Sequence, residues 1–233
     1  MALTTAGKPA PNARRKTDRW EVGEEYAEEF RQRWGWRGLE FGNWVRLNER
    51  SNYLKGLSHE FTNIAKGFGI EESQLGHIPG REPLSLGLGA RGQGRRRIIG
   101  HYEPGGHVIN LVRNSRGRAL VHEWGHALDC VAGQATGSGQ YWSLGPEWAE
   151  AIGSTPEYRK VSAQRNMPSR VGGRKDGYWT REVEYFARAF EVWADRRIDK
   201  KPLSKAIPDG TEADHLCKVI DRVFAEVFSG RTC

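Results

Sequence analysis

Cysteine and long apolar runs are scarce in this sequence, and both shortages bear on where the protein works. The three cysteines, Cys130, Cys217 and Cys233, are odd in number and show no C-x-x-C spacing. This usage is typical of a reducing cytosol rather than of a disulfide-stabilised secreted protein. No apolar run approaches the roughly 18 residues of a membrane span, and the N-terminus has no apolar stretch of the signal-peptide kind. We therefore expect a cytoplasmic protein without a membrane span or Sec export.

The sequence does contain enough apolar material for one core. Its 233 residues are 37% hydrophobic and include nine tryptophans, which favours a helical core wedged by large aromatic side chains. Residues 1–18 are rich in Gly, Pro, Ala, Thr and basic side chains without periodicity, so we expect a disordered basic tail there. Residues 19–233 are then a single domain. The sequence contains no internal repeat, and it indicates no oligomeric state.

The net charge of +7 is unevenly distributed. Residues 91–118 hold seven arginines and a single acid, Glu103. The densest group of basic residues is Arg91, Arg95, Arg96 and Arg97. A basic segment of this kind attracts a nucleic-acid backbone or an acidic protein. A solvated arginine-rich loop gives the same pattern, and charge alone does not separate the two interpretations.

The most informative motif is His122-Glu123-Trp124-Gly125-His126, which reads H-E-x-x-H. Its flanks are apolar and nearly uncharged, which indicates a buried helix. Histidines four residues apart leave the same face of a helix, so both imidazoles can bind one zinc ion. Glu123 lies beside them and can take a proton from an attacking water. Cys130, one turn further along, is expected to pack in the core.

The periodicity of apolar residues predicts an α+β fold that is mainly helical, with a small sheet or hairpin beside the motif helix. The β-rich runs 97–103 and 107–113 flank Pro104-Gly105-Gly106, which predicts a hairpin. Its two histidines, His101 and His107, are expected to have structural roles. Besides the motif helix, the expected helices cover residues 20–36, 51–68, 146–164, 180–197 and 212–228, and the expected loops cover 41–44, 133–146 and 167–177.

A glycine-rich run also contains G-x-G-x-x-G, from Gly87 to Gly92. A dinucleotide-binding fold needs a helix directly after this motif. Three arginines and an expected strand follow it here. We therefore reject a dinucleotide site.

A catalytic zinc needs a third protein ligand, and H-E-x-x-H provides two. Ala132 stands six residues past His126, where a third histidine would be expected, so the ligand must come from a later element. The expected helix over 180–197 carries Glu184, Arg188 and Glu191 on one face, beside an apolar stripe of aromatic residues. An ordinary amphipathic helix with surface ion pairs has the same spacing. Spacing alone leaves Glu182, Glu184 and Glu191 as candidate ligands.

The blocks V-H-E-W-G-H-A-L-D and E-V-E-Y-F-A-R-A-F-E resemble the gluzincin metallopeptidases. The second block is similar to the zinc-glutamate helix of the anthrax lethal factor protease domain. This resemblance implies a zincin-like fold in which Glu184 is the third zinc ligand and Tyr178 assists the transition state. It also implies that the strand at 107–113 is a sheet edge that pairs with an extended substrate.

Further blocks resemble the large polyvalent protein-associated metallopeptidase domain, which occurs in proteins of phages and mobile elements. They are F-G-N-W at 41–44, L-G-L-G-A-R-G-Q-G at 86–94, H-Y-E-P at 101–104 and V-I-N-L at 108–111. With the two metal blocks, the resemblance covers residues 20–197. It implies a phage or mobile-element protein, located in the cytoplasm of a bacterial host or associated with a virion.

These features predict a zinc-dependent endopeptidase that acts on proteins or peptides. Glu123 is the expected general base, and Tyr178 is the expected hydrogen-bond donor to the oxyanion. Asp129 is a candidate acceptor for the second N–H of a ligand histidine, with a surface acid near the helix end as the alternative. Two other functions stay open. One is a protease for nucleic-acid-bound proteins, docked by the arginines, and the other is a non-catalytic module with a structural zinc.

Overall fold

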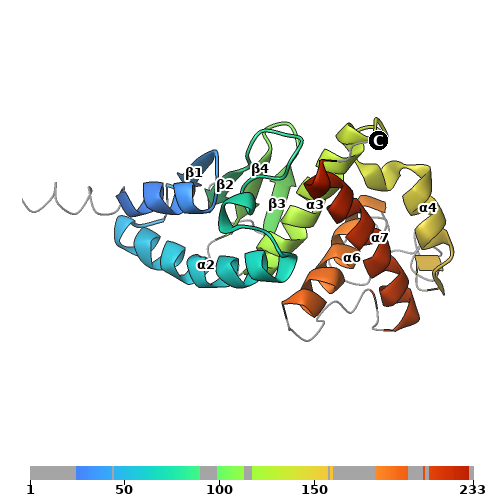
Figure 1. Ribbon diagram of the computed structural model, residues 1–233. Helices are drawn as coiled ribbons and strands as arrows, with labels where there is room; N and C mark the ends of the chain where they lie inside the picture. Colours follow the sequence, from blue (N-terminus) through green and yellow to red (C-terminus); the bar gives the residue numbers. More distant parts are fainter. Residues whose placement is uncertain are drawn as a thin grey trace, which may run out of the picture.

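The protein has an α+β fold, mainly helical with one small mixed sheet (Figure 1). The computed structural model describes residues 25–43, 45–89, 99–112, 117–156, 158–159, 182–198, 207 and 210–230. The longer helices are α2 (Leu47–Phe68), α3 (Gly117–Ala135), α4 (Pro146–Gly153), α6 (Glu182–Arg197) and α7 (Thr211–Ser229). Residues 25–33 are also helical, and η1 (Glu72–Gln74) and η2 (Trp142–Leu144) are short 3-10 helices. The prediction of the fold class is confirmed.

The sheet has the strand order β1-β2-β4-β3. Its strands are β1 (Gly38–Phe41), β2 (Ser85–Leu88), β3 (Gly100–Glu103) and β4 (Val108–Leu111). The β1–β2 and β2–β4 pairs are parallel, and β3 runs antiparallel to β4. The predicted hairpin is therefore present, with its turn at residues 104–107.

The prediction that the strand at 107–113 forms the sheet edge is wrong. It corresponds to β4, which lies inside the sheet because β2 pairs with its second side. The edge beside α3 is instead β3. The glycine-rich sequence of β2 has a weak intrinsic strand preference, and its pairing partners lie far away in the chain. β1 was missed for a related reason, since Phe41 ends a strand where a turn is expected.

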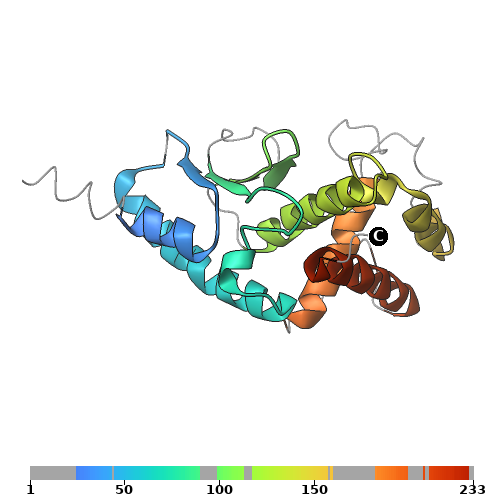
Figure 2. The same ribbon diagram turned by 45° about the horizontal axis from the view of Figure 1, so that its top comes forward.

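Helix α3 occupies the centre of the molecule. Figure 1 and Figure 2 show it between the sheet, on one side, and α6 with α7, on the other. It contacts β3, β4, α2, α6 and α7, and most of its residues are buried. The sequence-based expectation of a buried motif helix is confirmed.

Large aromatic side chains fill the core, as the tryptophan content predicts. Phe68, at the end of α2, contacts the rings of Trp124, Phe190 and Trp193. Ring-to-ring contacts thus connect α2 and α6 to α3 at Trp124, within the motif. Helix α7 closes the same cluster, because Phe224 packs against Trp193.

The helix boundaries follow local sequence signals with two exceptions. Helix α2 ends at Gly69, whose left-handed conformation (φ 69°) lets its N–H bond the last helical carbonyls. Helix α3 continues to Ala135, three residues into the segment where a loop is expected. The predicted helix over 146–164 is confirmed in part: α4 ends at Gly153, residues 156 and 158–159 are helical again, and residues 160–164 lie outside the described part of the chain. The hydroxyls of Ser154 and Thr155 donate to carbonyls of α4 and compete with a continuing helix.

No helix in the described part of the chain combines the length and apolar character that crossing a membrane requires.

Candidate metal centre

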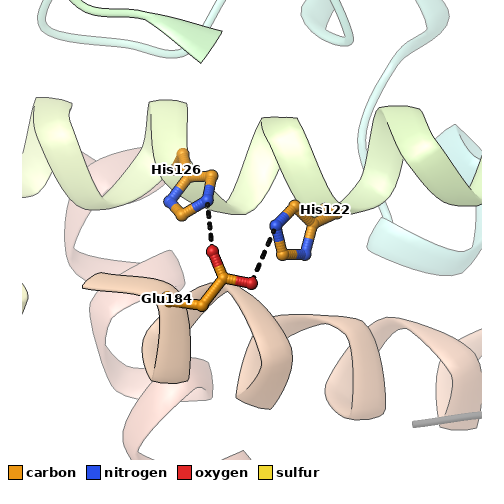
Figure 3. Close-up of side chains that lie close together, drawn as sticks. All are labelled: His122, His126 and Glu184. Carbon is orange, nitrogen blue, oxygen red and sulfur yellow. Dashed lines mark ion pairs between the residues drawn. The ribbon is translucent and has the colours of Figure 1, made fainter. Parts of the chain in front are cut away.

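Three side chains from two helices converge at the centre of the molecule. His122 and His126 lie one turn apart on α3, with ring centroids 4.8 Å apart. Glu184 rises from the first turn of α6 between them, as Figure 3 shows. Its Oε1 lies 3.5 Å from His122 Nε2, and its Oε2 lies 3.7 Å from His126 Nε2. The three potential ligand atoms all lie within 4.8 Å of one another.

This donor set fits a metal ion. Ligand atoms about 2.1 Å from one tetrahedral ion are about 3.4 Å apart, close to the two nitrogen-to-oxygen distances found here. Two imidazoles and one carboxylate are also a ligand set of catalytic metal sites. The sequence predicts that His122, His126 and Glu184 act together, and the structure brings all three together.

Glu191 holds the far side of His122. Its Oε1 lies 2.6 Å from His122 Nδ1, so the Nδ1–H donates to it and leaves Nε2 facing Glu184. The sequence keeps Glu191 as an alternative ligand, but the structure places it on the nitrogen that points away from the ligand cluster. Such an acceptor fixes the orientation and tautomer of a metal-binding imidazole.

Glu182, the remaining alternative, lies outside the cluster. Its carboxylate accepts a hydrogen bond from the Tyr158 hydroxyl at 3.2 Å, and its backbone carbonyl accepts one from the Trp148 indole. It therefore serves the packing of the N-terminal end of α6.

Both predicted roles of Asp129 are wrong. Asp129 is fully buried and accepts hydrogen bonds from the backbone N–H and the hydroxyl of Ser143, at 2.7 and 2.6 Å. Burial raises the pKa of this carboxyl to about 7, against the opposing effect of the Ser143 donors. The residue fastens η2 to α3, whereas His122 Nδ1 bonds Glu191 and His126 Nδ1 has no hydrogen-bond partner among the described residues. Residue spacing could not reveal this, because Ser143 comes from a loop without periodicity.

Glu123 lies against the edge of the sheet. It is 5% exposed, and its carboxylate accepts a hydrogen bond from the backbone N–H of Tyr102 in β3. Gly100 permits this approach, since a Cβ there would be 3.0 Å from Glu123 Cγ. Burial raises the pKa of Glu123 to about 7, although His122 opposes the shift. The group is thus poised to exchange a proton near neutral pH.

The side chains of the candidate metal site influence one another electrostatically. Burial disfavours the charged form of His122, but Glu184 and Glu191 outweigh it and raise the pKa to about 10. Burial also opposes ionisation of Glu184, yet the two histidines hold its pKa far below the usual range. For His126, burial dominates and lowers the pKa. In the absence of metal, a proton on His122 thus balances the charge of the carboxylates.

The backbone of β3 offers hydrogen-bonding groups next to Glu123. Val112 donates to the carbonyl of Ile99 at 3.1 Å, which makes these two residues a hydrogen-bonded pair. The alternation along the β3–β4 register then turns the N–H and C=O groups of Gly100 and Tyr102 toward the outer edge. No strand among the described residues pairs with that edge.

The two histidines of the hairpin do not belong to the ligand cluster. His107 is fully buried, with φ 49°, and its Nδ1 lies 2.8 Å from the Tyr102 hydroxyl. Burial and the nearby Arg81 lower its pKa to about 4. His101 pairs with Glu103 at 2.9 Å. Cys130 is fully buried, in agreement with the expected packing role.

Other predicted functional residues lie outside the described part of the chain. They are Tyr178, Arg91, Arg95, Arg96 and Arg97. Conversely, the sequence did not reveal that Arg188 donates to Glu184 or that the Tyr102 N–H binds Glu123. The i, i+4 spacing of Glu184 and Arg188 could have indicated the first contact.

Comparison with known proteins supplies no family for this chain: none of the protein-family models matches it, and neither does any curated protein.

Proposed function

We propose that the protein is a zinc-dependent endopeptidase of the gluzincin type. The observation that carries the proposal is the convergence of His122, His126 and Glu184 beside a buried glutamate, Glu123. A structural zinc site closes with four protein ligands, whereas a catalytic one uses three and keeps a position open. The zinc assignment rests on the His-His-Glu chemistry and on the sequence resemblance.

Each residue of the proposed site has a separate role in peptide hydrolysis. Bound zinc would polarise the scissile carbonyl and lower the pKa of the attacking water. Glu123 takes the proton of that water and delivers it to the leaving amine. A carboxylate with a pKa near 7 suits both halves of this transfer, and the Tyr102 N–H holds it in place. By resemblance, Tyr178 donates a hydrogen bond to the oxyanion, a contribution of about 3–4 kcal/mol when the donor is well placed.

The outer edge of β3 supports an extended peptide as substrate. A peptide that adds to this edge would bond the outward N–H and C=O of Gly100 and the outward C=O of Tyr102, next to Glu123, whose carboxylate accepts from the Tyr102 N–H. Main-chain pairing of this kind is independent of side-chain identity. It therefore favours unfolded segments of proteins as substrates over small molecules. The sequence resemblance to a metallopeptidase domain of phages and mobile elements also favours a phage or mobile-element origin for the protein.

A metal analysis combined with a digestion assay tests the proposal. We expect one zinc per chain and cleavage of an unfolded protein substrate by the native sequence. Glu123→Gln should retain the zinc and lose cleavage by a factor of about 10² or more. Glu184→Ala should lose both the zinc and the cleavage.

Two results would contradict the proposal in different ways. Equal cleavage by Glu123→Gln and the native sequence would remove Glu123 from the mechanism. Zinc bound at full stoichiometry without cleavage of any unfolded protein would instead favour a non-catalytic binding module.

A further inference from the structure

Arg188 lies one turn after Glu184 on α6. Its Nη2 donates a hydrogen bond to Glu184 Oε1 at 3.2 Å. The Arg188 side chain is 18% exposed and that of Glu184 is 5% exposed, so this pair is largely removed from water. An exposed i, i+4 pair on a helix contributes only about 0.2–0.5 kcal/mol. A buried guanidinium beside a metal ligand calls for a more specific role.

The two oxygens of Glu184 have different surroundings. Oε1 accepts from Arg188 and lies 3.5 Å from His122 Nε2, whereas Oε2 lies 3.7 Å from His126 Nε2. A carboxylate with both oxygens free can bind a metal through both, which would use the position that a catalytic site keeps open. A charge-assisted hydrogen bond to one oxygen opposes this, because the guanidinium must be displaced before that oxygen can bind.

We propose that Arg188 is a positioning residue that keeps Glu184 a one-oxygen ligand by occupying Oε1. The metal is then bound through Oε2, and the fourth position stays available. The inference rests on the proposed metal site. The same guanidinium repels a divalent cation, so its presence costs metal affinity, which a residue serving affinity alone would not do.

Cobalt(II) in place of zinc makes the coordination visible. Its visible absorption is strong with four ligands and several-fold weaker with five, so band intensity reports how Glu184 binds. We expect the native protein to show the strong bands. Arg188→Met keeps the aliphatic stem but removes the donor, and its absorption per bound cobalt should fall several-fold. Arg188→Gln retains a donor and should keep most of the intensity.

Arg118→Met is the matched control. Arg118 pairs across the same two helices with Asp195, one turn after Glu191, at 2.8 Å. Its removal should leave the cobalt spectrum unchanged. Arg188→Ala replaces the methionine variant if that protein does not fold, because alanine has the highest helix propensity.

The outcomes separate this inference from the proposed function. Native-like spectra in Arg188→Met and Arg188→Ala, each with one bound cobalt, would overturn the positioning role and leave the metal site intact. Failure of the native protein to bind cobalt or zinc would overturn the proposed function itself. A loss of intensity in Arg118→Met equal to that in Arg188→Met would also contradict the inference, because the effect would then not be specific to the arginine that bonds Glu184.

Discussion

The two histidines of the motif have different surroundings, although they occupy equivalent positions on the same face of the helix. His122 is held through Nδ1 by Glu191, whereas His126 Nδ1 is buried without a hydrogen-bond partner among the described residues. Only the first ring therefore has its orientation fixed by a carboxylate. The spacing i, i+7 from Glu184 explains how one helix provides both the ligand and this acceptor.

Removing the Glu191 carboxylate should weaken metal binding without abolishing it. We expect Glu191→Ala to lower zinc affinity about 10–100-fold, because the His122 ring loses its anchor and some basicity. Competition with a chelator of known affinity measures the change. Glu182→Ala is the control, since it removes an acid from the same helix that binds Tyr158 instead. Complete loss of zinc from Glu191→Ala would make Glu191 a ligand.

At the scale of elements, the site depends on a close approach of α3 and α6. Arg118, His122 and His126 on α3 face Asp195, Glu191 and Glu184 on α6, so the helices run antiparallel. Gly125, within the motif, is a point of close contact between them. A Cβ there would lie 3.0–3.2 Å from three atoms of Phe190, a fully buried side chain.

A methyl group at this contact should separate the helices. We expect Gly125→Ala to destabilise the protein by about 1–3 kcal/mol through overpacking and to weaken zinc binding at the same time. Urea unfolding and chelator competition measure the two effects. Gly56→Ala is the matched control in α2, where a Cβ meets nothing within 4 Å. It should stabilise the protein by about 0.5–1 kcal/mol through helix propensity. A stabilised Gly125→Ala would refute the close contact.

The sequence predicts those elements whose signal is local. Helices α2, α6 and α7 follow from apolar periodicity, and α2 and α7 end at the glycines Gly69 and Gly230. The β3–β4 hairpin follows from its turn. Strands β1 and β2 pair in parallel with distant partners, and no local pattern carries that information. This is also why the sheet edge was assigned to the wrong strand.

The ligand set was predictable only in part for the same reason. Helical spacing fixes His122 and His126 on one face, because four residues make about one turn. Spacing leaves three candidate glutamates on α6. The choice among them depends on the position of α6 along the axis of α3. Packing contacts such as that between Phe190 and Gly125 determine this position.

For the whole molecule, the metal site joins two parts of the chain. His122 and His126 belong to α3, which packs on the sheet, and Glu184 belongs to α6, which packs on α7. A ligand that binds only the folded state stabilises it by mass action. The ion should therefore stabilise the whole folded chain, and it should raise the free energy of global unfolding.

We expect zinc at about 1,000 times its dissociation constant to add about 4 kcal/mol to the free energy of unfolding. For a chain of this length, that corresponds to a rise in melting temperature on the order of 10 °C. Glu184→Ala should lose the increment, and Glu182→Ala should keep it. An unchanged melting temperature with zinc bound would mean that unfolded chains bind it equally well.

The size of this increment should rise with pH. The neighbouring carboxylates raise the pKa of His122, so metal binding must release its proton below that pKa. The raised pKa also stabilises the metal-free fold at low pH, an advantage lost as pH increases through it. These are two views of the same proton, and its release makes the increment smaller at pH 6 than at pH 8, by up to about 1.4 kcal/mol per pH unit. Melting curves with zinc and with chelator at both pH values measure it. An increment that shrinks as pH rises would contradict a protonated His122 in the metal-free protein.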